Sequence, residues 1–148
     1  MSNLKKYFLP LMFTAIGIFL GVGIYTFIYA KGYSYMSDDP KSCVNCHVMR
    51  ENYSSWNSAS HRDIACNGCH TPDNIIRKYL VKAENGFNHS WAFTFGPPEV
   101  IQIKSRSTNV VEDNCIRCHK ETLSAVFVQT HKNRQRCFTC HQSVGHSF

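Results

Sequence analysis

Four copies of the pattern Cys-x-x-Cys-His lie between residues 43 and 141, and together they use all eight cysteines of the chain. In this pattern the two thiols are spaced to add to the two vinyl groups of one haem, and the adjoining imidazole reaches the iron. The attachment residues are Cys43, Cys46, Cys66, Cys69, Cys115, Cys118, Cys137 and Cys140. The motifs therefore predict four covalently bound haem c groups.

Zinc and disulfides are two other uses of such cysteines. Gaps of 19 residues between the first two motifs and 18 between the last two suit a pair of zinc ribbons. A zinc site of four cysteines, however, has no use for a histidine after every second cysteine. Disulfides within Cys-x-x-Cys pairs would be redox-active rather than structural. Haem is therefore the favoured interpretation.

Each six-coordinate haem iron has two axial positions, and the histidines match that demand in number. The motifs supply His47, His70, His119 and His141 as proximal ligands. The remaining candidates for the distal side are His61, His89, His131 and His146. Two imidazoles on one iron suit electron transfer, because no position remains for a substrate. His146 follows His141 too closely to reach the opposite face of the same haem, so as a ligand it would serve another one. The alternative for each spare histidine is an ordinary packed or exposed imidazole.

The first motif continues as Cys46-His47-Val48-Met49. A thioether two residues beyond the histidine can replace it on the iron and raise the potential, although a single methionine is more often a packing residue. This motif follows soon after the apolar N-terminal segment, so its haem is expected nearest to any lipid-soluble donor. We therefore predict that electrons are accepted at the first haem.

The N-terminal segment is the element expected to hold the motifs at a membrane. Residues 8–30 include no charged side chain, and these 23 residues at about 1.5 Å each span a hydrocarbon core of about 30 Å. The run is too long for a cleaved signal peptide, and Ile28 stands where a small residue would precede the cut. Lys5 and Lys6 favour a cytoplasmic N-terminus. The prediction is a cytoplasmic segment (1–7), a single-pass anchor in the cytoplasmic (inner) membrane (8–30) and a periplasmic haem domain (31–148).

Length and charge narrow the classes of function. The 148 residues (17.0 kDa) leave room for one small domain beyond the anchor, too little for a large apolar core. The formal charge of +6 is too mild to indicate nucleic acid as a partner. Gly17 and Gly21 have the spacing by which two membrane helices approach each other. A homo-oligomer paired through the anchors is thus one expectation, and ordinary membrane glycines are the other.

With an uncleaved anchor and four such motifs, the first as C-x-x-C-H-x-M, the chain resembles the NapC/NirT family of membrane-anchored tetrahaem quinol dehydrogenases. The resemblance covers nearly the whole chain. The local strings that carry it are Ser60-His61, Lys82-Ala83, Asn88-His89-Ser90, Ala92-Phe93-Thr94, Glu112-Asp113-Asn114-Cys115 and Ser143-Val144-Gly145-His146. It implies that Met49 rather than His47 holds the first iron, beside the membrane, where that haem meets menaquinol.

The same resemblance implies roles for other residues. His61 and His146 would be distal ligands, and Lys82 would belong to the quinol site. Some members have an acidic residue at the position of His89, so His89 either caps the first iron or contacts quinol. His131 matches no pattern of the family.

The fold is predicted to be mainly helical with extensive loops, because little strand pattern is present. Asn74 to about Phe95 has helical composition, ended by Gly96-Pro97-Pro98. One face of this helix carries Lys78, Lys82, Asn85 and His89. The face is either a solvated stripe or turned to the first haem, where Lys82 and His89 would accept the protons that quinol oxidation releases.

The remaining segments carry weaker patterns. The aromatic residues of the helix, Phe87, Trp91, Phe93 and Phe95, would rest on membrane lipid or cover a quinol ring. Residues 105–109 are expected to form a loop, and Asp113 or Asn114 to cap a short helix that enters the third motif. Residues 123–130 are expected to form another helix.

The expected function is electron transfer from menaquinol to a periplasmic multihaem reductase, with the catalytic subunit of an ammonia-forming nitrite reductase as the favoured acceptor. In this role the chain has menaquinol dehydrogenase activity and is not itself the nitrite-reducing subunit. A donor of the same family that serves a different periplasmic reductase is the nearest alternative. A small multihaem enzyme acting directly on nitrite or hydroxylamine is disfavoured, because the iron most expected to be open lies at the membrane.

Overall fold

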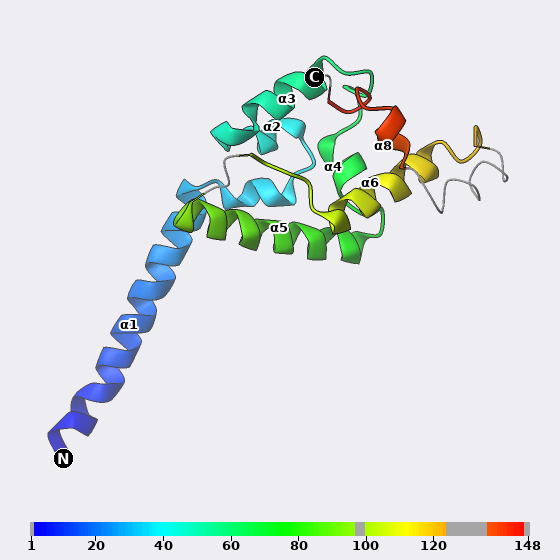
Figure 1. The fold of residues 1–148 in the computed structure, drawn as a ribbon. Coiled ribbons are helices and arrows are strands. Elements are labelled where there is room, and N and C mark those ends of the chain that lie inside the picture. The colour runs from blue at the N-terminus through cyan, green and yellow to red at the C-terminus, as the bar shows by residue number, and fades with distance from the viewer. Residues whose placement is uncertain (1, 97–99, 124–135, 147–148) are drawn as a thin grey trace. The chain divides into compact units, whose positions relative to one another are not determined.

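The computed structural model describes residues 2–96, 100–123 and 136–146, which form helices joined by loops (Figure 1). No strand is present in these ranges, and the predicted mainly helical class is confirmed. The chain divides into two compact units, Met1–Ser34 and Tyr35–Phe148. The predicted assignment of segments 1–7, 8–30 and 31–148 to cytoplasm, membrane and periplasm stays a prediction.

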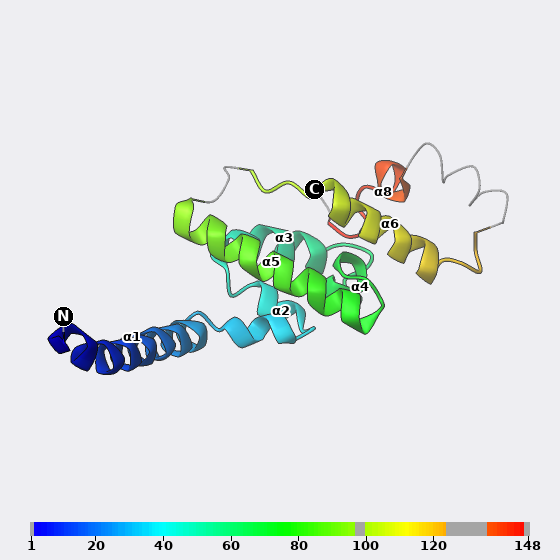
Figure 2. The same cartoon turned by 90° about the horizontal axis from the view of Figure 1, so that it is seen from below.

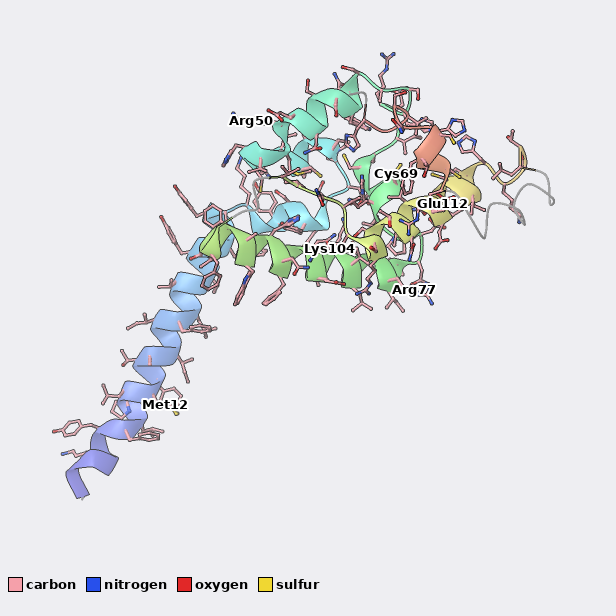
Figure 3. All side chains as sticks on the ribbon, viewed as in Figure 1. Met12, Arg50, Cys69, Arg77, Lys104 and Glu112 are labelled. Atoms are coloured by element: carbon pink, nitrogen blue, oxygen red, sulfur yellow. The ribbon has the colours of Figure 1, made fainter. Side chains whose placement is uncertain are left out.

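The first unit is built on helix α1 (Ser2–Tyr29). Its stretch Lys6–Tyr29 has the length and composition of a membrane span, and side chains such as Met12 project outward around it (Figure 3). Thr14 and Thr26 donate their hydroxyls to backbone carbonyl oxygens four residues earlier, at 2.9 and 2.7 Å. These bonds satisfy polar groups inside the helix, as an apolar medium requires. The predicted span thus coincides with one continuous candidate membrane helix.

The second unit consists of one long helix, α5, and several shorter helices (Figure 2). Its elements are α2 (Pro40–Cys43), η2 (His47–Met49), α3 (Arg50–Asn57), α4 (Cys66–His70), α5 (Ile75–Phe95), α6 (Ser105–Cys118) and α8 (Cys137–Cys140), and a turn η1 (Gly32–Met36) leads into it. Helix α4 packs on α6, α6 packs on α8, and α3 packs on η2. Both views of the ribbon show α4, α6 and α8 side by side (Figures 1 and 2).

Helix α5 matches the prediction for residues 74 to about 95. The Asn74 side chain caps it by accepting a hydrogen bond from the Arg77 backbone N–H at 3.1 Å. Gly96 ends it with a φ of 108°, a conformation that a residue with a Cβ rarely adopts. The predicted stop at Pro97-Pro98 lies outside the described residues.

Two expectations around the third motif are wrong. Residues 105–109 are not a loop but the first turns of α6, and neither Asp113 nor Asn114 caps a helix, because both lie inside α6. Helix α6 buries polar Thr108 and Asn114 and bonds both: the Thr108 hydroxyl donates to the Ser105 carbonyl oxygen at 2.7 Å. Packing against α4 thus overrides the turn preference of these side chains. The helix expected at 123–130 lies, beyond Leu123, outside the described residues.

Apolar packing contributes little to the second unit. Among the described residues, Ala59 is the only buried hydrophobic one, whereas Thr71, Lys82, Thr108 and Asn114 are buried polar residues. Large apolar side chains of α5, such as Ile76, Leu80 and Phe87, are exposed instead. Hydrogen bonds between the motifs and their neighbouring helices therefore position the elements, as expected where a small domain relies on something other than an apolar core.

Candidate functional site

Three of the four motifs adopt the same local form. The second is helix α4, the fourth is α8 followed by His141, and the third closes α6 and is followed by His119. One helical turn separates the two cysteines of each, so both thiols lie on one face with the histidine directly after them. This arrangement is the one that a single planar group bonded to both sulfurs and to the imidazole requires.

The first motif differs from the other three. Cys43 ends α2 and Cys46 precedes the separate turn η2, so His47 and Met49 fall in the same short turn. Met49 is half-buried, whereas His47 is exposed. The thioether is therefore the more enclosed of the two candidate ligands of the first iron.

The first and second motifs contact each other through their leading cysteines. The Cys43 and Cys66 side chains lie next to each other. The second and third motifs are joined by buried Asn114 of α6. Its Nδ2 donates to the backbone carbonyl oxygens of Cys69 and Thr71, both at 2.9 Å. An amide that bridges two carbonyls of α4 and its cap fixes the register of the two motifs.

The third and fourth motifs are joined by Glu112 of α6, which lies beside α8 (Figure 3). Its carboxylate accepts the Cys137 backbone N–H at 2.8 Å and the Cys137 thiol at 3.0 Å. The four motifs are thus linked in sequence order, the last three through Asn114 and Glu112, which lie just before the third motif on α6.

Two histidines of the motifs each face a histidine from outside the motifs. The ring centroids of His61 and His119 are 6.1 Å apart with planes at 59°, and those of His70 and His146 are 6.2 Å apart at 55°. A metal ion bonds an imidazole nitrogen at about 2 Å, so two rings on one ion have centroids about 6 Å apart. Both pairs therefore fit the two axial positions of one iron.

Hydrogen bonds orient both distal candidates. Nδ1 of His146 lies 3.1 Å from the Asn52 carbonyl oxygen and 3.1 Å from the Ser55 hydroxyl. A proton on Nδ1, donated to that carbonyl, leaves the lone pair on Nε2, as in most metal-bound histidines. Nδ1 of His61 lies 3.2 Å from the Ser60 hydroxyl, and the His61 backbone N–H donates to the Val144 carbonyl oxygen at 3.1 Å. The two distal candidates are therefore held by neighbouring backbone.

The other two spare histidines have different surroundings. His131 lies outside the described residues. His89 lies on α5, and its Nδ1 is 2.6 Å from the Tyr35 hydroxyl. The Tyr35 ring also lies against Gly86, where an added Cβ would be 3.7 Å from it. Burial raises the pKa of Tyr35 to about 12, and the nearby Cys46 and Cys43 thiols add to the effect. His89 is thus held beside the first motif.

Lys82 is the only buried charged side chain in the described part of the chain, with 7% of its surface exposed. Its ammonium donates to the Ser37 carbonyl oxygen at 2.9 Å and to the Asp38 carboxylate at 3.0 Å. Lys78, one turn earlier on α5, also pairs with Asp38. The polar face of α5 is therefore not a solvated stripe at these positions, because it packs on the segment that leads into the first motif.

Sequence reasoning missed four of these residues. Asp38 and Tyr35 carry no pattern, because one acid and one tyrosine in a loop are common. Asn114 and Glu112 belong to a string noticed for the family likeness, yet their bonds to other motifs need the tertiary structure. A useful signal was available for Asn114, since a polar residue directly before a cysteine pair is well placed to bond a neighbouring motif.

The zinc-ribbon alternative is not supported. No three of the His, Cys, Asp and Glu side chains in the described ranges come together as a metal site, whereas a ribbon needs four cysteines around one ion. No disulfide joins any of the eight cysteines in the structure. Pairs of cysteines on one helical turn and facing pairs of imidazoles fit haem instead.

Comparison with known proteins agrees with this geometry. The family model of the NapC/NirT cytochrome c family, N-terminal region, matches residues 4–103. The chain belongs to this family, and the predicted family is confirmed. It is a c-type cytochrome, with covalently bound haem c, and its one N-terminal apolar helix is a candidate membrane span.

Two individual relatives and one solved structure are similar to nearly the whole chain or most of it. The cytochrome c-type protein NrfH of Wolinella succinogenes is 36% identical over 97% of this chain and 89% of its own length. The cytochrome c nitrite reductase subunit NrfH of Nitratidesulfovibrio vulgaris is 32% identical over 79% of this chain and 72% of its own. A solved chain from the cytochrome c nitrite reductase NrfHA complex, bound to the inhibitor HQNO, superposes with a TM-score of 0.65 at 29% identity, covering 92% of this chain and 88% of that one.

Proposed function

We propose that this chain is a membrane-anchored tetrahaem cytochrome c that oxidises menaquinol and passes the electrons to the catalytic subunit of a nitrite reductase. The observation that carries the proposal is the sequential linkage of the four motifs, from Cys43 with Cys66 to Glu112 with Cys137. Haems attached in this order supply a row of one-electron carriers. A row of this kind suits a protein that transfers electrons rather than one that transforms a small substrate.

The relatives also support this proposed function. Two of them are NrfH proteins, one named as a subunit of cytochrome c nitrite reductase, and the superposed chain comes from a complex that holds HQNO. We infer that this chain assembles with a periplasmic multihaem nitrite reductase subunit. Residues 31–148 would lie in the periplasm, on a single-pass anchor in the inner membrane. Pairing of two anchors through Gly17 and Gly21 would make the assembly homo-oligomeric.

The facing imidazole pairs support an assignment of the iron ligands. His70 and His146 would serve the second haem, and His61 and His119 the third. Met49 would hold the first iron in place of His47, and His141 the fourth. Histidines on both sides of the second and third irons leave no position for nitrite there, which disfavours direct catalysis by this chain.

The quinol site would lie at α5, next to the first motif. Oxidation of a quinol releases two electrons and two protons, so the site needs groups that take up protons. His89 is the candidate for proton uptake, and Lys82, whose ammonium is held by Ser37 and Asp38, would bind a quinol oxygen. Burial, aided by the cation of Lys104, lowers the pKa of His89, so its imidazole is neutral at pH 7 and able to accept a proton.

One experiment tests the proposal as a whole. Membranes that contain the protein are given a menaquinol analogue as the only reductant, and haem is counted as pyridine haemochrome. We expect four haems per chain, reduced by the quinol, and in Lys82→Leu a loss of quinol reduction while dithionite still reduces every haem. Four haems that quinol does not reduce would remove the dehydrogenase role, and a count other than four would overturn the tetrahaem assignment.

A donor to a different periplasmic reductase is the second candidate. Membership of the NapC/NirT family favours it as much as it favours a nitrite reductase partner. The quinol-reduced protein would be mixed with a purified nitrite reductase subunit, and nitrite-dependent reoxidation of its haems followed. Reoxidation of the haems after mixing supports the nitrite reductase partner. Haems that stay reduced favour the other donor role.

A further inference from the structure

Asp38 is the one acidic residue that contacts the buried Lys82 in the described structure. It lies between α1 and α2, with its side chain 51% exposed, whereas the Lys82 side chain is 8% exposed. Oδ1 of Asp38 accepts the Lys82 ammonium at 3.0 Å, and the neighbouring Ser37 carbonyl oxygen accepts it at 2.9 Å. An ammonium removed from water needs such acceptors, because an unpaired buried charge is strongly unfavourable.

The Asp38 carboxylate is itself held by two further groups. Lys78 bonds its Oδ2, and Nδ2 of Asn67, within the second motif, donates to its Oδ1 at 2.7 Å. Asn67 also donates to the Ser37 carbonyl oxygen at 3.2 Å. The bonds from Lys78 and then Lys82 hold the pKa of Asp38 well below its usual range, so the carboxylate is ionised at neutral pH. The acceptor presented to Lys82 is thus charged and fixed in direction by the second motif.

These contacts determine how many N–H groups of Lys82 remain for a ligand. An ammonium has three N–H donors, and the two recorded bonds use two of them. Among the described residues no recorded hydrogen bond uses the third, which can face an oxygen of a bound molecule, and the ammonium also lies 5.7 Å from the Tyr79 ring centroid. We propose that Asp38 is a positioning residue of the quinol site: its carboxylate holds the Lys82 ammonium so that one N–H is directed to a quinol oxygen. This inference rests on the proposed function, in which Lys82 contacts quinol.

The test uses the full-length protein with its haems attached, in detergent. HQNO serves as the probe of binding, because its affinity is measured without turnover, and a menaquinol analogue as the probe of turnover. Asp38→Ala is expected to weaken HQNO binding and raise KM for quinol about tenfold, the range for a lost bond to a charged group. The Soret spectrum, the haem count and reduction by dithionite are expected to be unchanged. Asp38→Glu, which keeps the charge, is expected to recover most of the HQNO affinity.

Glu84 provides a matched control, because it is a carboxylate on α5 that forms an ion pair with Arg106. It bonds Arg106 at 2.7 Å on the exposed surface, away from the recorded partners of Lys82. Glu84→Gln is expected to leave HQNO affinity and KM unchanged. A loss in this variant equal to that in Asp38→Ala would mean that any altered charge on α5 weakens the site, and would overturn the specific role of Asp38.

Failure of this inference is distinguishable from failure of the proposed function. If Lys82→Leu loses HQNO binding while Asp38→Ala binds as the wild type does, Asp38 has no positioning role and the quinol site stands. If Lys82→Leu reduces its haems with quinol at the wild-type rate, the quinol site itself is misplaced. Should Asp38→Ala lose its haems, Asp38→Asn replaces it, and unchanged HQNO affinity in that variant would equally contradict the role.

Discussion

The surroundings of the first motif and those of the second and third motifs are built from different chemistry. Around the first motif, the proposed proton-exchanging region consists of charged and hydrogen-bonded side chains: Lys78 and Lys82 are paired with Asp38, and His89 is bonded to Tyr35. Between the second and third motifs lie an uncharged amide, Asn114, and facing imidazole pairs. The difference matches two tasks. Proton uptake needs groups that titrate or relay, whereas one-electron transfer is fastest where little rearranges.

The sharpest test of the electron-transferring region is His146→Ala. Because its ring faces His70 at 6.2 Å, its loss should open one axial position of the second iron and turn that haem from low spin to high spin. We expect about a hundredfold slower transfer of electrons beyond that haem. Electron paramagnetic resonance counts the low-spin sites, and stopped-flow mixing gives the rate. An unchanged low-spin count would show that His146 is not a ligand. Ser143→Ala, an exposed change nearby, is the control.

Asn114→Ala tests the bridge between the second and third motifs. The change leaves two carbonyl groups, at Cys69 and Thr71, without their shared donor, so we expect a loss of about 2 kcal/mol in the free energy of unfolding. Denaturant titration of the holoprotein measures it. The control is Asn109→Ala, which removes an exposed acceptor of Arg136 and should cost less than about 0.5 kcal/mol. Equal losses in both variants would contradict a special role for the buried amide.

Tyr35→Phe tests the proton-exchanging region with the smallest change of shape. It removes the hydroxyl 2.6 Å from Nδ1 of His89 but keeps the ring on Gly86. We expect quinol oxidation to fall about fivefold through loss of imidazole orientation, with the spin state of the first haem unchanged. A change of spin state would instead make His89 a ligand of the first iron. Tyr33→Phe, an exposed tyrosine of the first unit, should change neither quantity.

The smallest expected effect is the pH dependence of the Asp38 ion pairs. Since Lys78 and Lys82 lower the pKa of Asp38, its contribution to stability is complete above the unfolded pKa of about 4 and is lost as pH falls through the folded pKa. For a half-exposed carboxylate this contribution is less than about 1 kcal/mol. The Tm of the wild type should exceed that of Asp38→Asn by a constant amount from pH 7 down to about pH 4, and the gap should close below it. A gap that widens on acidification would contradict the assignment.

Some features could be predicted because a local pattern causes them. The helix after Asn74 follows from composition, a capping amide and Gly96, all within one segment. The attachment cysteines follow from spacing alone, since one helical turn brings both thiols to one face. The expected loop at 105–109 failed for the opposite reason: its polar residues prefer turns by themselves, but α6 packs on α4, where Asn114 of the same helix finds its buried partners.

The sequence by itself determined the candidate membrane helix, the family, the covalent haem chemistry and the residues able to ligate iron. The tertiary structure decided how these are combined: His146 faces His70, His61 faces His119, and Asp38 and Tyr35 hold Lys82 and His89. The physical reason is one of range. Thiol spacing, apolar length and helix caps act within a few residues of the chain, whereas a shared axial position or a buried ammonium needs partners brought from 44 to 76 positions away.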